Sequence, residues 1–225
     1  LALKTLRPAP MERDIYMWFG CAIDLRPHAD DPKKAFEFAR EEVAMSLSEQ
    51  KERMLEMVDE LIGALIVEHC PPNKHYDDWD YVALADGFEE QFDIDCPVLQ
   101  NKFTDAQEMA EKLYQDAENV LLKRMRELEE ESFLRLFRNT YLQEIDNLWI
   151  EHLQAMDRLR QGIGLHGYGQ RDPKREYKLE GHKMFMEMIR TIKANVTKSL
   201  FTVERVREED LQALEAQRRK DAEVR

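Results

Sequence analysis

Residues 104–161 contain neither proline nor glycine, the two residues that most often interrupt a helix. From Phe133 onward, apolar side chains recur there at steps of three or four residues, as one face of an α-helix requires. That stripe consists of Phe133, Phe137, Tyr141, Ile145, Leu148, His152, Met156, Leu159 and Ile163. The pattern predicts uninterrupted helix through this region, and at about 1.5 Å per residue the part from 132 to 163 would span roughly 48 Å.

The helical pattern stops at a glycine-rich segment. Half of the eight glycines lie within eight residues, namely Gly162, Gly164, Gly167 and Gly169. Glycine supplies the positive φ angles that a helix C-terminus and a tight loop need. A second helix is expected from Pro173 with Asp172 as its N-cap, so the two helices would form an antiparallel hairpin.

The rest of the chain also favours helix, so we expect a mainly α fold. Residues 33–69 carry apolar side chains at helical spacing until a proline pair ends the pattern. Asp78 and Thr104 are the expected N-caps of the next two helices. Residues 1–35 hold four prolines, and the apolar cluster 15–19 among them has two interpretations: local packing, which we favour, or docking to a partner.

The charge of the chain is acidic and unevenly distributed. Lys and Arg number 33 against 46 Asp and Glu, which gives a net charge of −13 and argues against nucleic acid as the main partner. Residues 72–95 hold eight acidic side chains and one basic one, whereas residues 158–200 hold ten basic and four acidic ones. The second segment therefore predicts a surface that faces an anionic partner.

Several classes of protein do not fit the sequence. No run of about 20 apolar residues is present, so no transmembrane helix is expected. Three widely spaced cysteines without a CxxC pattern argue against a zinc site or a disulfide framework and favour a cytosolic compartment. No glycine-rich phosphate-binding motif occurs. The sequence begins at Leu1 without an apolar leader, so we expect an excerpt of a longer reading frame.

Two clusters resemble metal or catalytic sites at first inspection. His75 adjoins the acidic segment 76–80, which lacks the spacing of a calcium-binding loop, so a solvated turn is favoured. His152 lies in the apolar stripe beside Trp149, without a second histidine four residues away. We expect both to be structural, and Trp149→Ala would cost about 3–5 kcal/mol if that side chain is buried.

The loop of the predicted hairpin is the strongest candidate for a binding site. Its tip would carry Leu165, His166 and Tyr168, and exposed apolar side chains there cost solubility unless they meet a partner. The flanking basic residues are Arg158, Arg160, Arg171, Lys174, Arg175 and Lys178. The loop predicts a probe that inserts into a partner, and the alternative is an ordinary turn that packs on its own chain.

The hairpin sequence closely resembles one known family. Residues 142–163, which read LQEIDNLWIEHLQAMDRLRQGI, are similar to SecA, the motor ATPase of the bacterial general secretion pathway. The loop residues Gly167 and Tyr168 and the segment Gln170–Lys174 also fit that family. The likeness covers about residues 54–219 but not residues 1–35, where the long scaffold helix of the family would be expected.

The resemblance implies a small helical wing domain beside a two-helix finger. Residues 54–130 would form the wing domain, and residues 131–205 the two-helix finger of the helical scaffold domain. Residues 206–225 would begin the charged C-terminal linker. Residues 1–53 would be a partly helical N-terminal segment that the resemblance does not place.

The resemblance also implies a function. In SecA the finger tip touches preproteins at the mouth of the SecYEG channel, so Leu165, His166 and Tyr168 would contact the polypeptide. The six basic residues would face the channel or anionic lipid headgroups, while Trp149, His152, Pro173 and the four loop glycines would support the finger. The chain would act in the cytoplasm, peripherally associated with the inner face of the bacterial cell membrane.

Nucleotide chemistry would lie outside this sequence. By resemblance, upstream domains would bind ATP and Mg²⁺, and the zinc motif of the family is not present here, so we expect no cofactor in this chain and no ATPase activity from it alone. Its partners would be SecYEG, the preprotein and the ATPase core, and the resemblance also allows a homodimer. The alternative is a free-standing helical scaffold or interaction module without motor activity.

Overall fold

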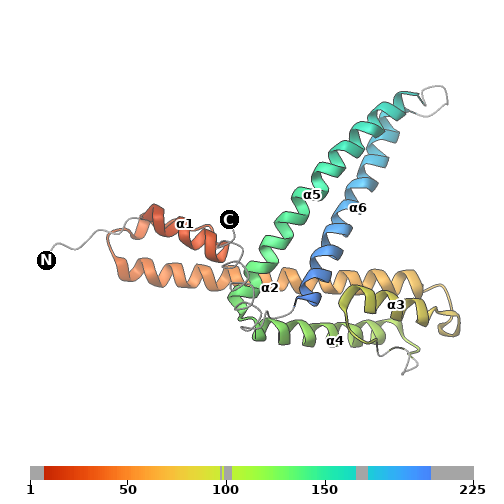
Figure 1. The fold of residues 1–225 in the computed structure, drawn as a ribbon, viewed down its shortest axis with the longest axis horizontal. Helices are drawn as coiled ribbons and strands as arrows, with labels where there is room; N and C mark the ends of the chain where they lie inside the picture. Colours follow the sequence, from red (N-terminus) through yellow and green to blue (C-terminus); the bar gives the residue numbers. More distant parts are fainter. Residues whose placement is uncertain (1–7, 97, 99–102, 166–171, 204–225) are drawn as a thin grey trace, which may run out of the picture.

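The computed structural model describes residues 8–96, 98, 103–165 and 172–203, and within them every regular element is a helix (Figure 1). This confirms the expected mainly α fold. The α-helices are α1 (Pro8–Phe19), α2 (Pro32–His69), α3 (Tyr81–Phe92), α4 (Ala106–Glu127), α5 (Glu130–Leu165) and α6 (Pro173–Thr202). Short 3-10 helices, η1 (Arg26–His28) and η2 (Tyr76–Asp78), precede α2 and α3.

The helices form a body from which a hairpin projects. α2 is the longest helix, at 38 residues, and runs the length of the body. α1 lies beside its N-terminal half, and α3 and α4 pack on its C-terminal half, while α5 and α6 lead away side by side (Figure 1). In the described part of the chain, no helix combines the length and the hydropathy needed to cross a membrane.

Side-chain caps mark where α3, α4 and α6 begin. Asp172 accepts a hydrogen bond from the Lys174 backbone N, as expected for the N-cap of α6. The other two predicted caps are wrong by one or two residues. Asp80 caps α3 by accepting from Ala83 N at 3.0 Å, because Asp78 belongs to η2, and Asp105 rather than Thr104 caps α4.

The predicted uninterrupted helix is broken between α4 and α5. α4 ends at Glu127, and Glu129 adopts a left-handed conformation with φ 66° before α5 begins. The apolar faces of the two helices end in buried Met125 and begin in buried Phe133, and both residues belong to one core. A straight helix would carry the second face away from that core, so packing imposes the corner although no glycine or proline marks it.

One hydrophobic core anchors the hairpin in the body. Its fully buried side chains include Met54 and Ile62 of α2, Phe88 and Phe92 of α3, Leu113 of α4, Phe133 of α5 and Phe201 of α6. The rings of Phe92 and Phe201 meet edge to face, with centroids 5.2 Å apart. The first turns of α5 and the last turns of α6 are therefore fixed among the other helices.

Candidate functional site

The predicted apolar stripe of α5 faces α6. Phe133 and Phe137 are buried at the base of the hairpin. The other members of the stripe are partly buried along the contact with α6, namely Tyr141, Ile145, Leu148, His152, Met156, Leu159 and Ile163. Two helices, α5 and α6, share this seam along the shaft, which is the part of the hairpin that projects from the body. Each helix therefore keeps a wide solvent-exposed face there.

Gly181 brings the two helices together half-way along the shaft. It is buried in α6, and a Cβ atom built there would lie only 2.8 Å from the Met156 Cε. A hydrogen in place of a side chain therefore lets α6 approach α5 closely. Gly181 was not predicted to be a site residue, although a glycine inside a helical pattern is a recognised sign of such packing.

Three rings join the helices across one face of the shaft. The His152 ring lies 5.6 Å from the Trp149 ring and 5.9 Å from the Phe185 ring, the latter edge to face. His152 is partly buried between these two rings. Trp149 is 44% exposed, so the full burial on which the predicted loss of about 3–5 kcal/mol depended is not met, because α6 is the one described helix that covers α5 at this height.

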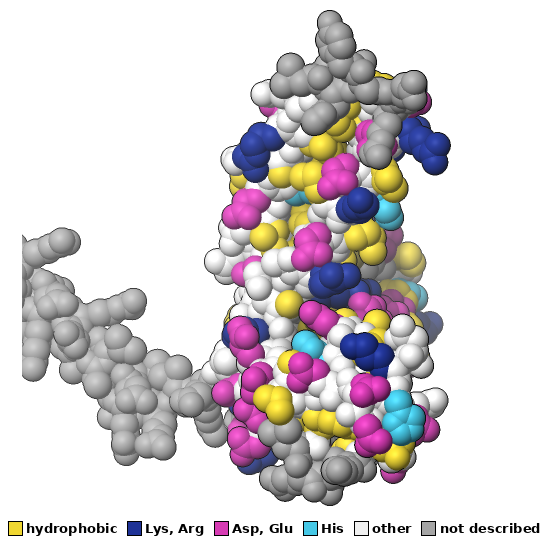
Figure 2. All heavy atoms as spheres, turned by 90° about the vertical axis from the view of Figure 1, so that its right-hand side faces the viewer, with side chains coloured by type: hydrophobic (Ala, Val, Ile, Leu, Met, Phe, Trp, Pro, Cys, Tyr) yellow, Lys and Arg dark blue, Asp and Glu magenta, His cyan; other side chains and the backbone are white. Residues whose placement is uncertain are grey.

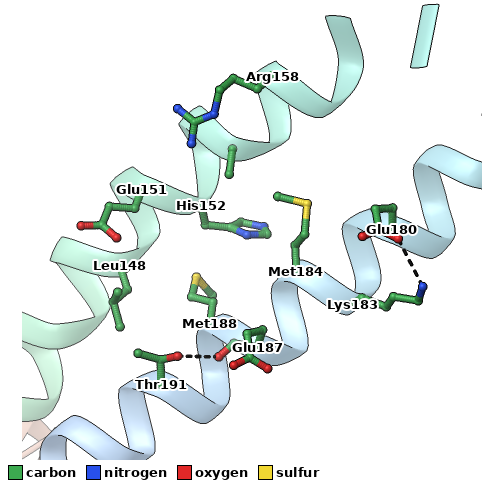
Figure 3. Close-up of a pocket in the computed structure, with 11 residues that line it drawn as sticks. Leu148, Glu151, His152, Arg158, Glu180, Lys183, Met184, Glu187, Met188 and Thr191 are labelled. Atoms are coloured by element: carbon green, nitrogen blue, oxygen red, sulfur yellow. Dashed lines mark hydrogen bonds and ion pairs between the residues drawn. The ribbon is translucent and has the colours of Figure 1, made fainter. Parts of the chain in front are cut away.

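A shallow groove of about 530 Å³ runs between α5 and α6 near these rings (Figure 3). Figure 3 shows Met184 and Met188 pointing from α6 toward His152 of α5, with charged side chains at the margins. On α6, Lys183 pairs with Glu180 at 3.2 Å. The remaining lining residues are Leu148, Glu151, Ala155, Arg158, Glu187 and Thr191. An apolar floor with a charged margin suits packing against a side chain or helix of a partner.

Within the described residues, no group of three or more His, Cys, Asp or Glu side chains could hold a metal ion. His75 and Asp77 approach each other at 3.3 Å, but both side chains are mostly exposed. This pair lies in the turn at η2, as the favoured interpretation of a solvated acidic segment requires.

The expected tip lies mostly outside the described residues. The structure does not describe His166, Gly167, Tyr168, Gly169 or Arg171. Of Leu165, the last residue of α5, it describes the backbone only. One expectation near the tip is wrong: α5 continues in helical conformation through Gly162 and Gly164, so these glycines do not end the helix. Pro173 opens α6 as predicted.

The basic residues near the tip are exposed, but the shaft is not uniformly positive. Exposed basic side chains at this end are Arg158, Arg160, Lys174, Arg175 and Lys178. Arg160 lies 3.4 Å from Asp157, and Figure 2 shows acidic and basic side chains alternating along one side of the shaft around apolar ones. The excess of basic residues in the segment 158–200 is thus spread along α6.

Two basic residues of that segment bind the body of the molecule. Lys193 of α6 pairs with Glu60 of α2, and Lys198 pairs with Glu90 of α3 at 3.3 Å. These contacts use part of the predicted basic surface to attach the hairpin, which the sequence analysis did not foresee. The exposed basic residues that do not contact the body include Arg158, Lys174 and Lys178 near the far end of the hairpin.

Comparison of this sequence with known proteins identifies a matching family and several relatives. Residues 37–204 match the family model described as the SecA Wing and Scaffold domain. The chain is 41% identical to the protein translocase subunit SecA of Sorangium cellulosum over 214 residues, which are 94% of this chain and 21% of that protein. It is 37% identical to the same subunit of Myxococcus xanthus over 82% of this chain and 19% of that protein. The chain thus spans about a fifth of the length of these curated relatives.

Proposed function

The chain belongs to the SecA family of protein translocase subunits, matching its wing and scaffold region, and from this premise we propose that the α5–α6 hairpin is the lever through which such a subunit moves a preprotein. In this proposal ATP hydrolysis in other SecA domains moves the base of the hairpin. The far end then pushes the polypeptide into the SecYEG channel.

One observation supports the proposal most directly: the hairpin is fixed at one end and projects from the body at the other (Figure 1). At its base, Phe133, Phe137 and Phe201 are buried in the core, while farther out α5 and α6 run side by side away from the other described helices (Figure 1). The 36 residues of α5 correspond to about 54 Å of helix. A small rotation at the base therefore becomes a displacement several times larger at the tip.

The proposed contacts at the tip follow from side-chain chemistry. Tyr168 offers an aromatic ring that packs on many kinds of side chain and has little rotamer entropy to lose. Together with Leu165 and His166, it would touch the moving polypeptide without selecting a sequence. The basic residues around the tip, including Arg158 and Lys174, would face loops of the channel or anionic lipid headgroups at the inner face of the cell membrane.

Other parts of the proposal concern SecA outside this chain. ATP and Mg²⁺ would be bound by the ATPase core, which the base of the hairpin would contact, and a homodimer is a further assembly to test. The division into a wing domain at 54–130, a finger at 131–205 and a linker from 206 also remains a prediction. The corner at Glu129 lies next to the predicted boundary between the wing domain and the finger.

The test replaces the matching region of Sorangium cellulosum SecA with this chain and places a photo-crosslinking amino acid at position 168. During stalled transport we expect a crosslink to the preprotein that requires both ATP and SecYEG. Gln154, which is exposed on the shaft of α5, provides the matched control position and should give no such crosslink. Crosslinks from position 168 only within SecA itself would refute the lever and favour a helical scaffold without a motor role.

Tyr168→Ala in the same chimera tests the grip separately. We expect preprotein transport to fall while the thermal unfolding midpoint stays the same, because a side chain at a position that the sequence predicts to be a loop should contribute little to the core. Full transport by this variant would contradict a gripping role for Tyr168.

A further inference from the structure

The N-terminal helix α1 lies outside the residues that match the family model, yet it reaches the base of the hairpin. None of its 12 residues is fully buried, and an isolated helix of this length is marginal in water. Its inward side chains Met11 and Ile15 pack on a small cluster around Leu25, Ala35 and Ala39, and Glu12 accepts a hydrogen bond from the Leu25 backbone N at 2.8 Å. The position of α1 therefore depends largely on the contacts that neighbouring helices make with its C-terminal end.

Side chains from two other helices bind the C-terminal end of α1. Arg138 of α5 donates from Nη2 to the backbone O of Trp18 and from Nη1 to Oε1 of Gln50, both at 2.9 Å. Gln50 of α2 in turn donates from Nε2 to the backbone O of Phe19 at 3.0 Å. Carbonyl groups in the last turn of a helix lack partners within that helix, and a cation there meets the negative end of its dipole.

Gly20 makes this contact possible. Its φ is 66°, and its N donates to the backbone O of Tyr16 at 2.9 Å, which ends α1 in a left-handed turn. A Cβ atom built at this position would clash with Cδ of Arg138. Any side chain at position 20 would therefore push the arginine away from the carbonyl groups that it binds.

The contact holds α1 without a salt bridge in the described residues. The two acceptors of Arg138 are an amide and a carbonyl, both neutral, and partial burial lowers the pKa of its guanidinium, as does nearby Arg135. Arg135 itself lies over the Trp18 ring, 4.8 Å from its centre. Two cations, Arg135 and Arg138, thus contact the end of one short helix and orient α1. Because their acceptors are neutral, the attachment is weaker than a salt bridge to a carboxylate would be.

We infer that α1 is a detachable strap, held at its C-terminal end against the base of the hairpin by Arg138, and that it restrains the angle between the hairpin and α2 while it is docked. Arg138 of α5 contacts both Gln50 of α2 and the C-terminal end of α1. Figure 1 shows α5 passing α2 beside that end of α1. The core beneath the hairpin is built from other helices, so it would persist when the strap leaves. In this arrangement Arg138 is a positioning residue that acts through α1.

Hydrogen exchange on the 225-residue chain tests whether the strap detaches. In Arg138→Met, which keeps side-chain length but removes the donors, amides of residues 11–20 should exchange at least about tenfold faster, while amides in α3 and α4 and the urea midpoint stay unchanged. Gly20→Ala should reproduce this local effect. Arg190→Met is the matched control, because Arg190 is exposed and its described ion pair is with Glu187, three residues away on the same helix. Unchanged exchange in residues 11–20, or equal acceleration throughout the chain, would overturn the inference.

Pulsed electron paramagnetic resonance tests the restraint on the hairpin. Spin labels at exposed positions 56 of α2 and 154 of α5 should give a narrow distance distribution in the otherwise unchanged chain and in Arg190→Met. The distribution should broaden in Arg138→Met and in Gly20→Ala. Equal widths in all four proteins would show that α1 does not restrain the hairpin.

Discussion

Trp149 occupies an exposed position on the hairpin, beside the apolar face of α5. It lies half-way along α5 with 44% of its surface exposed, and its ring meets that of His152. Trp149→Ala therefore removes one aromatic contact and should lower the free energy of unfolding by about 1 kcal/mol. Phe133→Ala is the control, since Phe133 is fully buried on the same helix and should lose about 3–5 kcal/mol. Similar losses in urea denaturation of the two variants would contradict this difference.

Cys70 carries a pH dependence of stability. Burial, followed by the nearby carboxylate of Asp80, raises the pKa of its thiol from 9.0 to about 11. The folded chain thus keeps the thiol neutral where the unfolded chain ionises it, so this contribution to stability is complete below pH 9 and is lost as the pH rises to about 11. We expect the decline in stability between these values to be shallower in Cys70→Ala than in the parent chain.

Reaction with a thiol reagent provides an independent measurement on the same residues. All three cysteines are free and buried, so the folded chain should react slowly at pH 8, whereas all three thiols should react promptly after unfolding in guanidinium. Prompt reaction of the folded chain would show that the thiols are accessible and would remove the cause given for the raised pKa of Cys70.

At the scale of elements, the corner between α4 and α5 has a local conformational cost. Glu129 adopts φ 66°, which is unfavourable for a residue with a Cβ atom and natural for glycine. Glu129→Gly should therefore raise the free energy of unfolding by up to about 1 kcal/mol, because the relief of strain exceeds the added entropy of the unfolded chain. Gln115→Gly, at an exposed position within α4, should lower it by about 1 kcal/mol. A loss of stability in both variants would refute the assignment of strain to Glu129.

The elements also show what local sequence chemistry can and cannot predict. Asp172 and Pro173 act on the next few residues, so the start of α6 was predicted correctly. The corner at Glu129 was missed, because it is imposed by two apolar faces that pack on one core and not by any turn-forming residue. Periodicity identified the apolar face of α5 but not the number of neighbouring helices, which is why the burial of Trp149 could be stated only as a condition. The proposed contact of Tyr168 remains a prediction, since that residue lies outside the described part of the chain.

At the scale of the whole molecule, the uneven charge of the sequence serves attachment at one end of the hairpin. Lys193 and Lys198 of α6 pair with Glu60 of α2 and Glu90 of α3 around the apolar core that fixes the base. A lever of the kind proposed would need the hairpin and its base to turn as one rigid unit. Ion pairs placed outside the core resist bending between the two parts, because they act farther from the buried core than its apolar side chains do. The acidic body and the basic α6 are therefore complementary parts of one junction.

Charge reversal tests this junction through the pair formed by Lys193 and Glu60. Lys193→Glu should lower the free energy of unfolding by about 0.5–1 kcal/mol at low salt, because two carboxylates then face each other across the helices. Adding Glu60→Lys should restore most of the loss, and about 1 M NaCl should reduce both effects. Lys183→Glu is the control, since Lys183 pairs with Glu180 within α6 and does not reach the body. If Glu60→Lys fails to compensate, the charge split does not hold the hairpin, and packing around Phe133 and Phe201 alone fixes its base.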